Sequence, residues 1–548
     1  MASKRTPKVA VIGAGSLFLA TLAALVAPAV LAQVTATGLP YAAPAHHHSV
    51  LPRTLNTVSF LQAVTYDTGG RFAASVEVAD LNGDGNPDLV VTNIYGGTGF
   101  PPSLVGVLLN NGDGTLQPIV IYDSGGSWAQ SVTVADVNGD AKLDLLVTNE
   151  TGSASCPNGA VDILGGNGDG TFRPAVEYCS GGSTPLSVAV ADVNDDGKPD
   201  LAVANAGSNN VGVLIGNGDG TFLPAVSYGS GWPGPAHVIV ADVNGDRRPD
   251  LVTADFSTIP SSVSVLLGNG NGTFQPAVIS ASGGYYAIWV AIADVNRDGF
   301  PDLLVANERA CTHCQNGSVG VLLGNGDGTF QAAVGYSSGG NGAMSLAVAD
   351  VNGDGKLDLV AANYESDNLG VLLGNGDGTL QPAVTYASGG KGPISVAIAD
   401  VNRDAKPDLL AVNWYGNGND AGLVALLLNN IAFCTTPPMI TFSTTPTSLW
   451  PPNGKTVPVT VSGTIADTGC TVTTAAYAVT DEYGKMQPSG PVTLNSSGDY
   501  SFTVFLEASR RGTDIDGRVY TVTVTARNNA GDTGSEAKMV VVPHNHGH

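Results

Sequence analysis

Variants of one nine-residue stretch, Asp80-Leu81-Asn82-Gly83-Asp84-Gly85-Asn86-Pro87-Asp88, occur seven times in the chain, and the rest of the sequence is organised around them. Each copy reads D-x-N-x-D-x-x-x-D and is followed by an apolar run such as Leu89-Val90-Val91. A period of 50 to 56 residues indicates an array of similar structural units. The copies begin at Asp80, Asp136, Asp192, Asp242, Asp294, Asp350 and Asp400.

Oxygen-bearing side chains at positions one, three, five and nine of each copy predict a cation site. In a tightly coiled loop these oxygens converge on one point, and calcium binds about six to eight oxygen ligands. A turn without an ion is the alternative, because Asp, Asn and Gly favour turns in any case. Turn chemistry alone would let Asp, Asn, Ser and Gly interchange, whereas all seven copies keep the four side-chain oxygens.

We therefore predict up to seven bound Ca2+ ions, each held by four side chains of one loop. In the first loop the backbone carbonyl of Asn86 would add a further oxygen. The predicted metal ligands are Asp80, Asn82, Asp84, Asn86, Asp88, Asp136, Asn138, Asp140, Asp144, Asp192, Asn194, Asp196, Asp200, Asp242, Asn244, Asp246, Asp250, Asp294, Asn296, Asp298, Asp302, Asp350, Asn352, Asp354, Asp358, Asp400, Asn402, Asp404 and Asp408.

The N-terminal segment predicts export. In residues 1–32, basic side chains precede a long apolar run, residues 9–32, that ends in small residues, as a signal peptide does. A retained membrane anchor is the alternative, since the run is long enough to cross a bilayer. Residues 33–57, rich in Ala, Pro and Thr, are expected to form a flexible leader. We predict a secreted or cell-surface protein, with the periplasm as a further compartment, and no membrane insertion after signal removal.

Composition and charge favour an all-β protein that binds cations. The chain contains 72 Gly, and many of its apolar segments alternate with polar residues. The net charge is −24, and residues 58–434 contain 12 Lys and Arg against 38 Asp and Glu. Twenty-one of these acids are the three aspartates of the seven copies. The acidity is therefore explained by cation sites, and it argues against nucleic acid as a partner.

Each repeat predicts four short strands, and the ends of the array predict how it closes. In the third repeat the strands are expected at 187–191, 201–205, 211–215 and 221–228, with a hairpin turn before the fourth. The seventh repeat stops near Asn430, before its fourth strand, and residues 59–66 match the missing strand. We predict a seven-bladed β-propeller, residues 58–434, in which the N-terminal strand completes the last blade.

The loop D-x-N-x-D-G-x-x-D-L, followed by G-N-G-D-G-T-F-x-P-A-V, resembles the FG-GAP/VCBS repeat, the blade unit of integrin α-chain propellers. The resemblance covers roughly residues 58–434 and implies seven blades with calcium in the hairpin between the first two strands of a blade. The family includes adhesins, lectins and some lyases, so it does not fix an activity. Position six is Gly in four copies but Ala141, Arg247 and Ala405 in the others, where we expect weaker calcium binding because a left-handed turn suits Gly best.

Aromatic residues in the variable loops predict a binding face. The connections after the second and fourth strands differ in every repeat and are expected on one face, which would bind an extracellular protein or glycan. The alternative is that the rings cap the ends of the blades. The aromatic residues are Tyr95, Phe100, Trp128, Trp232, Phe256, Tyr285, Tyr364, Trp414 and Tyr415.

Six cysteines in an exported chain predict disulfides. Cys311 and Cys314 are expected to form a local disulfide, since a zinc knuckle needs a second ligand pair and a redox centre needs a βαβ context. Two further pairings are suggested by position alone: Cys156 with Cys179, and Cys434 with Cys470.

Residues 435–548 lack the repeat period and contain several short strand-like runs separated by turns. This pattern predicts an immunoglobulin-like β-sandwich, which we interpret as a spacer or docking module.

Three classes of function remain: a secreted calcium-dependent binding or adhesion protein, a lectin-like carbohydrate binder, and a polysaccharide lyase or hydrolase. Six of the eight histidines lie in the terminal tails, which leaves His237 and His313. The sequence contains no Ser-His-Asp arrangement or H-E-x-x-H motif, and its carboxylates are assigned to cation loops. We therefore predict that the chain is not an enzyme.

Overall fold

The computed structural model describes residues 58–96, 102–256, 261–311, 313–416, 420–430, 437–467, 472–485, 487–495, 497–513, 517–528 and 532–544. The chain divides into two units, Met1–Asn56 and Thr57–His548, and all described residues belong to the second. The predicted signal peptide and leader lie outside the described residues. Within the described ranges, no helix is long and apolar enough to cross a membrane.

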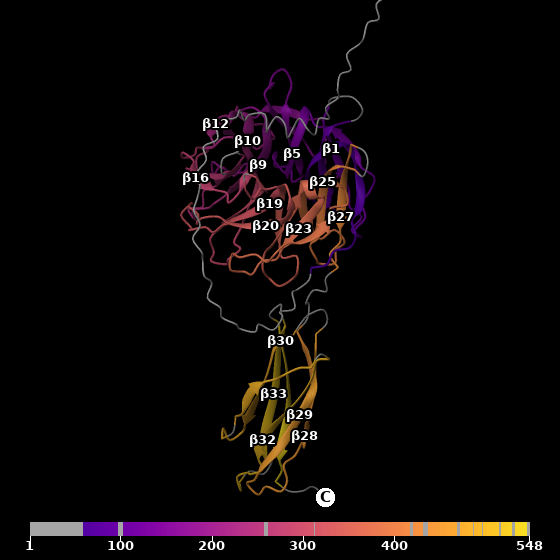
Figure 1. Ribbon diagram of the computed structural model, residues 1–548, viewed down its shortest axis with the longest axis vertical. Coiled ribbons are helices and arrows are strands. Elements are labelled where there is room, and N and C mark those ends of the chain that lie inside the picture. The colour runs from indigo at the N-terminus through magenta and orange to yellow at the C-terminus, as the bar shows by residue number, and fades with distance from the viewer. Residues whose placement is uncertain are drawn as a thin grey trace, which may run out of the picture. The chain divides into compact units, whose positions relative to one another are not determined.

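The described residues form an all-β structure of many small antiparallel sheets (Figure 1). The regular helices in these ranges are the short 3-10 helices η1 (Ala206–Ser208) and η2 (Tyr364–Ser366). In chain order, the strands of the repeats are β1 (Val64–Ala79), β2 (Asp88–Tyr95), β3 (Leu104–Leu108), β4 (Val120–Asp123), β5 (Ser127–Ala135), β6 (Asp144–Thr151), β7 (Ala160–Leu164), β8 (Val176–Cys179), β9 (Pro185–Ala191), β10 (Asp200–Asn205), β11 (Asn210–Leu214), β12 (Val226–Gly229), β13 (Pro235–Ala241), β14 (Asp250–Asp255), β15 (Ser262–Leu266), β16 (Val278–Ala281), β17 (Tyr285–Ala293), β18 (Asp302–Arg309), β19 (Asn316–Leu322), β20 (Val334–Asn341), β21 (Ala343–Ala349), β22 (Asp358–Asn363), β23 (Asn368–Leu372), β24 (Val384–Ala387), β25 (Lys391–Ala399), β26 (Asp408–Tyr415) and β27 (Ala421–Leu427).

The second to sixth repeats each form one four-stranded sheet whose strands follow chain order, for example β5-β6-β7-β8. The first and seventh repeats share a seven-stranded sheet of order β25-β26-β27-β1-β2-β3-β4. They share it because β1 pairs twice: Val64–Asp67 pairs with β27, and the part from Arg71 to Ala79 pairs with β2. Figure 1 shows the indigo β1 beside the orange β27.

The pairing expected for residues 59–66 is therefore confirmed. Ahead of β1, Phe60 forms an antiparallel bridge with Asn429, and the Leu61 N–H donates to the Leu428 carbonyl at 2.8 Å. The ring of Phe60 packs edge-on against Tyr386, with centroids 5.1 Å apart, and the Tyr386 hydroxyl donates to the Val58 carbonyl. Residues from the start of the repeat region thus complete the sheet of its last repeat.

Neighbouring repeats contact one another through their first strands, in the order β1, β5, β9, β13, β17, β21, β25 and again β1. One hydrogen bond recurs between these strands. The Ser345 hydroxyl accepts from the N–H of Val396 at 3.2 Å, and Ser395 accepts from the N–H of Val76 at 3.3 Å. The seventh repeat therefore contacts the first through the same kind of bond that joins the sixth to the seventh.

The apolar core lies between neighbouring sheets. In the second strand of each repeat, residues such as Leu201 and Val203 are buried and belong to clusters shared with a neighbouring sheet, here that of the second repeat. This burial on both faces explains why the second strands are continuous apolar runs. The fourth strands, and the first residues of β1 that take this place in the seventh repeat, expose one valine each, at equivalent positions: Val64, Val120, Val176, Val226, Val278, Val334 and Val384.

A buried Asn lies at or within two residues of the end of the second strand in six repeats and fixes the chain that enters the repeat. In the third repeat the amide of Asn205 donates to the Ser180 carbonyl at 3.0 Å, and a Cβ added at Gly182 would lie 2.6 Å from the Asn205 Cβ. The second glycine of the Gly-Gly pair ahead of the first strand is therefore required by this contact. The fourth repeat departs at both positions, with Asp255 in place of Asn and Trp232 in place of the second Gly.

The C-terminal part forms two antiparallel sheets, β28-β29-β32 and β31-β30-β33-β34. They share one apolar core around residues such as Leu449, Val459 and Tyr520. The buried Arg518 guanidinium pairs with Asp481 at 2.5 Å and with Glu507 at 3.1 Å. Two sheets on one core agree with a sandwich, while the immunoglobulin-like type stays a prediction. The strands are β28 (Met439–Thr445), β29 (Thr456–Ala466), β30 (Val472–Asp481), β31 (Ser489–Pro491), β32 (Asp499–Glu507), β33 (Arg518–Asn528) and β34 (Thr533–Val542).

Candidate metal centres and binding face

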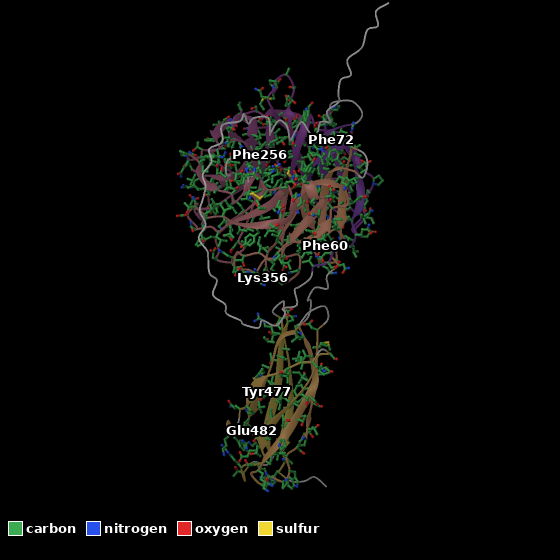
Figure 2. All side chains as sticks on the ribbon, viewed as in Figure 1. Phe60, Phe72, Phe256, Lys356, Tyr477 and Glu482 are labelled. Atoms are coloured by element: carbon green, nitrogen blue, oxygen red, sulfur yellow. A yellow bond between two sulfur atoms is a disulfide. The ribbon has the colours of Figure 1, made fainter. Side chains whose placement is uncertain are left out.

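The seven copies of D-x-N-x-D-x-x-x-D are called the acidic loops. Each of them connects the first strand of a repeat to its second. Because antiparallel strands place successive connections at opposite ends, these loops and the turns after the third strands lie on one face, the acidic-loop face. The connections after the second and fourth strands lie on the other, the variable-loop face. Figure 2 shows Phe72, in β1, and Phe256, in the connection after β14, on one side of the repeat region and Lys356, from an acidic loop, on the opposite side.

The first aspartate of each acidic loop binds the backbone of its own loop. Asp80 Oδ1 accepts from the N–H groups of Gly83 (2.8 Å) and Asp84 (3.1 Å), and Oδ2 accepts from the N–H of Gly85 at 2.8 Å. The bond to the sixth position recurs in all seven loops. The structure thus brings the first six residues of each copy into one tight turn around the first carboxylate.

Positions three and five continue this pattern. Asn82 Oδ1 accepts from the N–H of Asp84 at 2.8 Å, and Asp84 Oδ1 accepts from the N–H of Asn86 at 2.8 Å. In each case a side-chain oxygen accepts from the backbone N–H of the residue two positions later. This is the Asx turn that Asp and Asn form readily. The amide of Asn82 also donates to Asp84 Oδ2 at 3.1 Å, so the predicted ligands contact one another.

The ninth aspartate is fully buried in every repeat and joins the loop to the rest of its sheet. Asp88 Oδ2 accepts from the N–H of Leu81 at 3.0 Å, and Oδ1 accepts from the N–H of Asn110, after the third strand, at 2.8 Å. The same two bonds are present in all seven repeats. Burial raises the pKa of these carboxyls, to about 7 at Asp358 and about 6 at Asp408.

The donor set of each loop fits a hard cation in its chemistry. Three carboxylates and one amide oxygen in one turn are the ligands that calcium prefers, and an oxygen that accepts one N–H keeps a second lone pair. In the described ranges, however, no three His, Cys, Asp or Glu side chains are arranged to hold a metal ion. The carboxylates accept backbone N–H groups instead. Calcium binding by these loops therefore stays a prediction.

Basic side chains lie beside five of the fifth-position carboxylates, which sequence reasoning missed. In four loops the basic residue is the one at position seven of the same loop. Lys356 is an example, with its ammonium 3.2 Å from Asp354. The equivalent distances are 3.6 Å at Asp196, 3.8 Å at Asp246 and 3.3 Å at Asp404. The signal was visible in the sequence, since position seven is Lys or Arg in five copies. The loops that begin at Asp80 and Asp294 have an Asn and a Phe there.

The sixth position is left-handed in every loop. Ala141 (φ 61°), Arg247 (φ 67°) and Ala405 (φ 62°) adopt the conformation of Gly85 (φ 78°). The fourth position is left-handed as well, even at Arg297 (φ 62°), which was not anticipated although four copies have Gly there. The residues other than Gly at these two positions therefore keep the left-handed turn, which costs them more conformational free energy than it costs Gly.

The aromatic residues of the variable-loop face divide into two groups. Tyr95 and Trp414 are buried around Phe72, with ring centroids 5.6 Å from its ring, so for these two the capping interpretation holds. Six others are half-exposed, and one, Phe100, lies outside the described residues. The half-exposed residues are Trp128, Trp232, Phe256, Tyr285, Tyr364 and Tyr415.

The half-exposed rings of Trp128 and Tyr415 extend the buried cluster towards the surface. Trp128 lies 5.3 Å from Tyr95, and Tyr415 lies 5.5 Å from Phe72. The guanidinium of Arg71 lies over the Phe72 ring at 5.6 Å. These rings come from the seventh, first and second repeats and form one continuous aromatic cluster.

Three bulky aromatic residues on this face occupy left-handed backbone, which the sequence alone did not reveal. Phe72 (φ 57°), Trp128 (φ 63°) and Tyr286 (φ 57°) take one equivalent position in their repeats. In the fourth, sixth and seventh repeats that position is a glycine with φ of 62° to 71°. A bulky residue with positive φ is an outlier that costs about 1–2 kcal/mol. Strain of this kind is typical of functional sites.

Two of the expected disulfides are confirmed, Cys156–Cys179 and Cys311–Cys314. The first joins the loop after the second strand of the second repeat to the end of its fourth strand, and the second closes a variable loop. Cys434 and Cys470 lie outside the described residues.

The recurring four-stranded sheets, each with one acidic loop, define a β-repeat protein. The chain belongs to the FG-GAP-like repeat family, whose model matches residues 80–147, 153–203, 192–253, 242–305, 310–361 and 350–411. The family resemblance carried by the loop and turn motifs is thereby confirmed.

Two solved structures are similar at low identity. The biofilm matrix protein Bap1 of V. cholerae is 14% identical over 68% of this chain and 91% of its own, with a TM-score of 0.38. A functionally unknown protein from Desulfotomaculum acetoxidans DSM 771 is 15% identical over 57% of this chain and 89% of its own, also with a TM-score of 0.38. TM-scores this low establish neither the fold nor the function of this chain. A comparison with curated proteins found no match.

Proposed function

We propose that this chain is a secreted or cell-surface protein whose residues 58–434 form a calcium-binding, seven-bladed propeller that binds an extracellular protein or glycan in adhesion. The family and the pairing of β1 with β27 support the propeller. The bond from Val76 to Ser395 supports its closure. Full closure removes exposed sheet edges at the ends of the array.

The two disulfides support an oxidising compartment and therefore export through the signal peptide 1–32. In this proposal residues 33–57 are a leader, and residues 435–548 form an immunoglobulin-like domain that spaces or docks the propeller.

The observation that carries the binding function is the set of aromatic residues in left-handed backbone. Trp128 and Tyr286 are half-exposed, and both are strained where three other repeats have the unstrained glycine. A half-exposed ring held in strained backbone, at a position where other repeats have glycine, is best explained by a ligand. Flat apolar rings suit sugars as well as peptides, so a lectin-like activity is the second candidate on the same face.

A catalytic role, such as polysaccharide cleavage, is the weakest candidate. His237 stacks on Trp289 with ring centroids 3.7 Å apart, and its Nδ1 accepts the N–H of Val290 at 3.5 Å. It takes the place of the serine that joins first strands in other repeats, and burial lowers its pKa to about 3. This neutral ring has a structural role, so we propose that the chain is not an enzyme.

The test is a glycan array together with a panel of immobilised extracellular-matrix proteins, each probed with and without calcium. We expect wild-type binding that Trp128→Gly and Tyr286→Gly abolish. Gly relieves the left-handed strain, which offsets the lost ring contacts with Tyr95 and Phe256, and a melting transition of each variant shows that it is still folded. Phe505→Ala, which removes an exposed ring from the C-terminal sheets, is the matched control and should bind normally. Normal binding by both glycine variants would overturn the assignment of the face, and cleavage of an array glycan would favour an enzyme.

A further inference from the structure

The contact between the second and third repeats lacks a side chain that the other repeats supply. The residue after the third strand is Leu or Ile in six repeats but Gly165 in the second. The equivalent residues are Leu109, Ile215, Leu267, Leu323, Leu373 and Leu428.

Elsewhere this side chain fills the space against the turn of the next repeat. A Cβ added at Gly170 would lie 2.8 Å from the side chain of Leu109, and one at Gly272 would lie 2.9 Å from that of Ile215. At Gly220, the equivalent glycine of the third repeat, the same Cβ would meet only Asn138, at 3.2 Å. The missing side chain of Gly165 therefore leaves open a space that is filled in the other contacts.

This space is a cleft of about 460 Å³ on the acidic-loop face. Its apolar side is formed by Val137, Ile163 and the ring of Tyr178, whose hydroxyl donates to the Gly220 carbonyl at 3.1 Å. Its polar rim is formed by Arg173 and Asp140 from the second repeat and Asp219 from the third. An apolar floor with a few polar groups, in a volume of roughly 300–1,000 Å³, is typical of small-molecule sites.

Arg173 is a second departure from the repeat pattern, and it lies at the same cleft. The equivalent residue is Gln or Leu in the other repeats. Its guanidinium is 3.8 Å from Asp140 Oδ2, and its contacts to Asn167 Oδ1 (3.4 Å) and the Gly166 carbonyl (3.5 Å) are long. Since good N–H···O bonds are about 2.7–3.2 Å, this fork of donors is free to bind a ligand more closely.

The carboxylates on the rim also have acceptor capacity. Asp219 accepts two hydrogen bonds, from the N–H and the hydroxyl of Thr221, and both go to Oδ1. Asp140 Oδ1 accepts the Lys142 N–H, while Oδ2 faces Arg173. In the described residues, Oδ2 of each aspartate therefore lies on the rim without a short hydrogen bond.

We propose that this cleft binds one neutral sugar unit. An anionic ligand would meet the carboxylates of Asp140 and Asp219, and a cationic ligand would meet the Arg173 guanidinium. A neutral ring with several hydroxyls satisfies both, because each hydroxyl donates to a carboxylate and accepts from the guanidinium. The apolar face of the ring then packs on Ile163 and Tyr178. This site is separate from the variable-loop face and does not depend on the function proposed for it.

Saturation-transfer NMR of the full chain with glucose, galactose, mannose, fucose and N-acetylglucosamine tests the proposal. We expect transfer to at least one neutral sugar, and weaker transfer to glucuronic acid and glucosamine, the charged controls. Gly165→Leu should abolish the transfer while the melting temperature stays or rises, since a Cβ there meets Arg173 at an ordinary 3.6 Å. Arg173→Gln should weaken binding about tenfold, the loss expected for a charge-assisted hydrogen bond.

Leu267→Gly is the matched control, because it opens the same space in the fourth repeat next to Gln275 instead of an arginine. The double variant Leu267→Gly with Gly165→Leu should bind no sugar in the space opened in the fourth repeat. No transfer from the wild type to any neutral sugar, or undiminished binding by Gly165→Leu, overturns the proposal. So does a preference for either charged sugar. Trp128→Gly tests only the aromatic face, so the two proposals fail separately.

Discussion

The Ser395 hydroxyl of the seventh repeat accepts a hydrogen bond from the backbone N–H of Val76 in the first repeat, at 3.3 Å. The equivalent bond joins Ser345 to Val396, between the sixth and seventh repeats. The first and last repeats are thus joined as ordinary neighbours, and β1 must reach across to β27 to complete the last sheet. The integrity of the last repeat therefore depends on residues at the start of the first.

Deletion of residues 59–66 should destabilise the whole repeat region. It removes the pairing with β27 and the packing of Phe60 on Tyr386, and it exposes the edge of β27. Unpaired edges invite association with other chains. We expect a lower melting temperature and aggregation, measured by calorimetry and light scattering. Trimming residues 33–57 is the control and should change neither, whereas a monomeric deletion variant with wild-type melting would refute the role of this segment.

The repeats themselves made much of the fold predictable. Comparing seven copies located the acidic loops, and comparing the two ends located the strand that completes the last sheet. The roles of single residues within the loops were less accessible. Asp88 was expected only as a metal ligand, yet it is fully buried and joins its loop to Asn110 after the third strand. Such long-range bonds depend on the register between strands, which residue type does not encode.

The binding features were missed for a different reason. Gly165 indicates a cleft only when its neighbour in the next repeat, Gly220, is known. The cleft forms because the contact that a Leu or Ile side chain makes between other repeats is absent here. Trp128 and Tyr286 were visible as aromatic residues, but their left-handed backbone appears only in three dimensions. In both cases the exceptional residue differs from its equivalents in the other repeats, so alignment of the repeats was the signal that could have found it.

Calcium should stabilise the repeat region. Three aspartates per loop repel one another, and an ion that binds only the folded loop stabilises it by about 1.4 kcal/mol per site at ten times Kd. We expect EDTA to lower the melting temperature, and calcium, but not added sodium chloride, to restore it. Asp84→Ala should lose more of this shift than Asp246→Ala, since the loop of Asp246 has Arg247 and Arg248 at positions six and seven. A melting temperature indifferent to EDTA would leave these loops as ion-free turns.

Removing a basic neighbour should strengthen calcium binding by its loop. The Lys356 ammonium lies 3.2 Å from Asp354 Oδ2 and repels an incoming cation. The pair is partly buried, because the Asp354 side chain is only 9% exposed. Surface ion pairs are worth roughly 0–1 kcal/mol, and on that scale Lys356→Met should raise calcium affinity by about fivefold, measured by isothermal titration calorimetry. Lys391→Met is the matched control, because Lys391 pairs with Asp367 away from the acidic loops. Equal effects of the two variants would mean that net charge, rather than the local pair, sets the affinity.

Asp255 should make the fourth repeat less stable as pH rises. Burial raises its pKa from 3.8 to about 7, although hydroxyls of Ser264, Thr253 and Ser262 donate to it. Between these two values the unfolded chain loses the proton and the folded chain keeps it. The folded state therefore binds more protons, and the free energy of unfolding falls with pH across this window and levels off above about 7.

The variant Asp255→Asn tests this relationship, because Asn is the residue that the other six repeats have at this position. An amide keeps hydrogen-bonding capacity towards the hydroxyls of Thr253 and Ser262 but carries no charge. We expect the variant to melt higher than the wild type above pH 7, with the difference shrinking towards pH 4, in thermal scans at constant ionic strength. Asp123→Asn, which removes an exposed carboxyl, is the charge-matched control and should not reproduce the pattern of Asp255→Asn. A pH-independent effect of Asp255→Asn would mean that Asp255 is ionised in the folded protein and that its three hydroxyl donors compensate for burial.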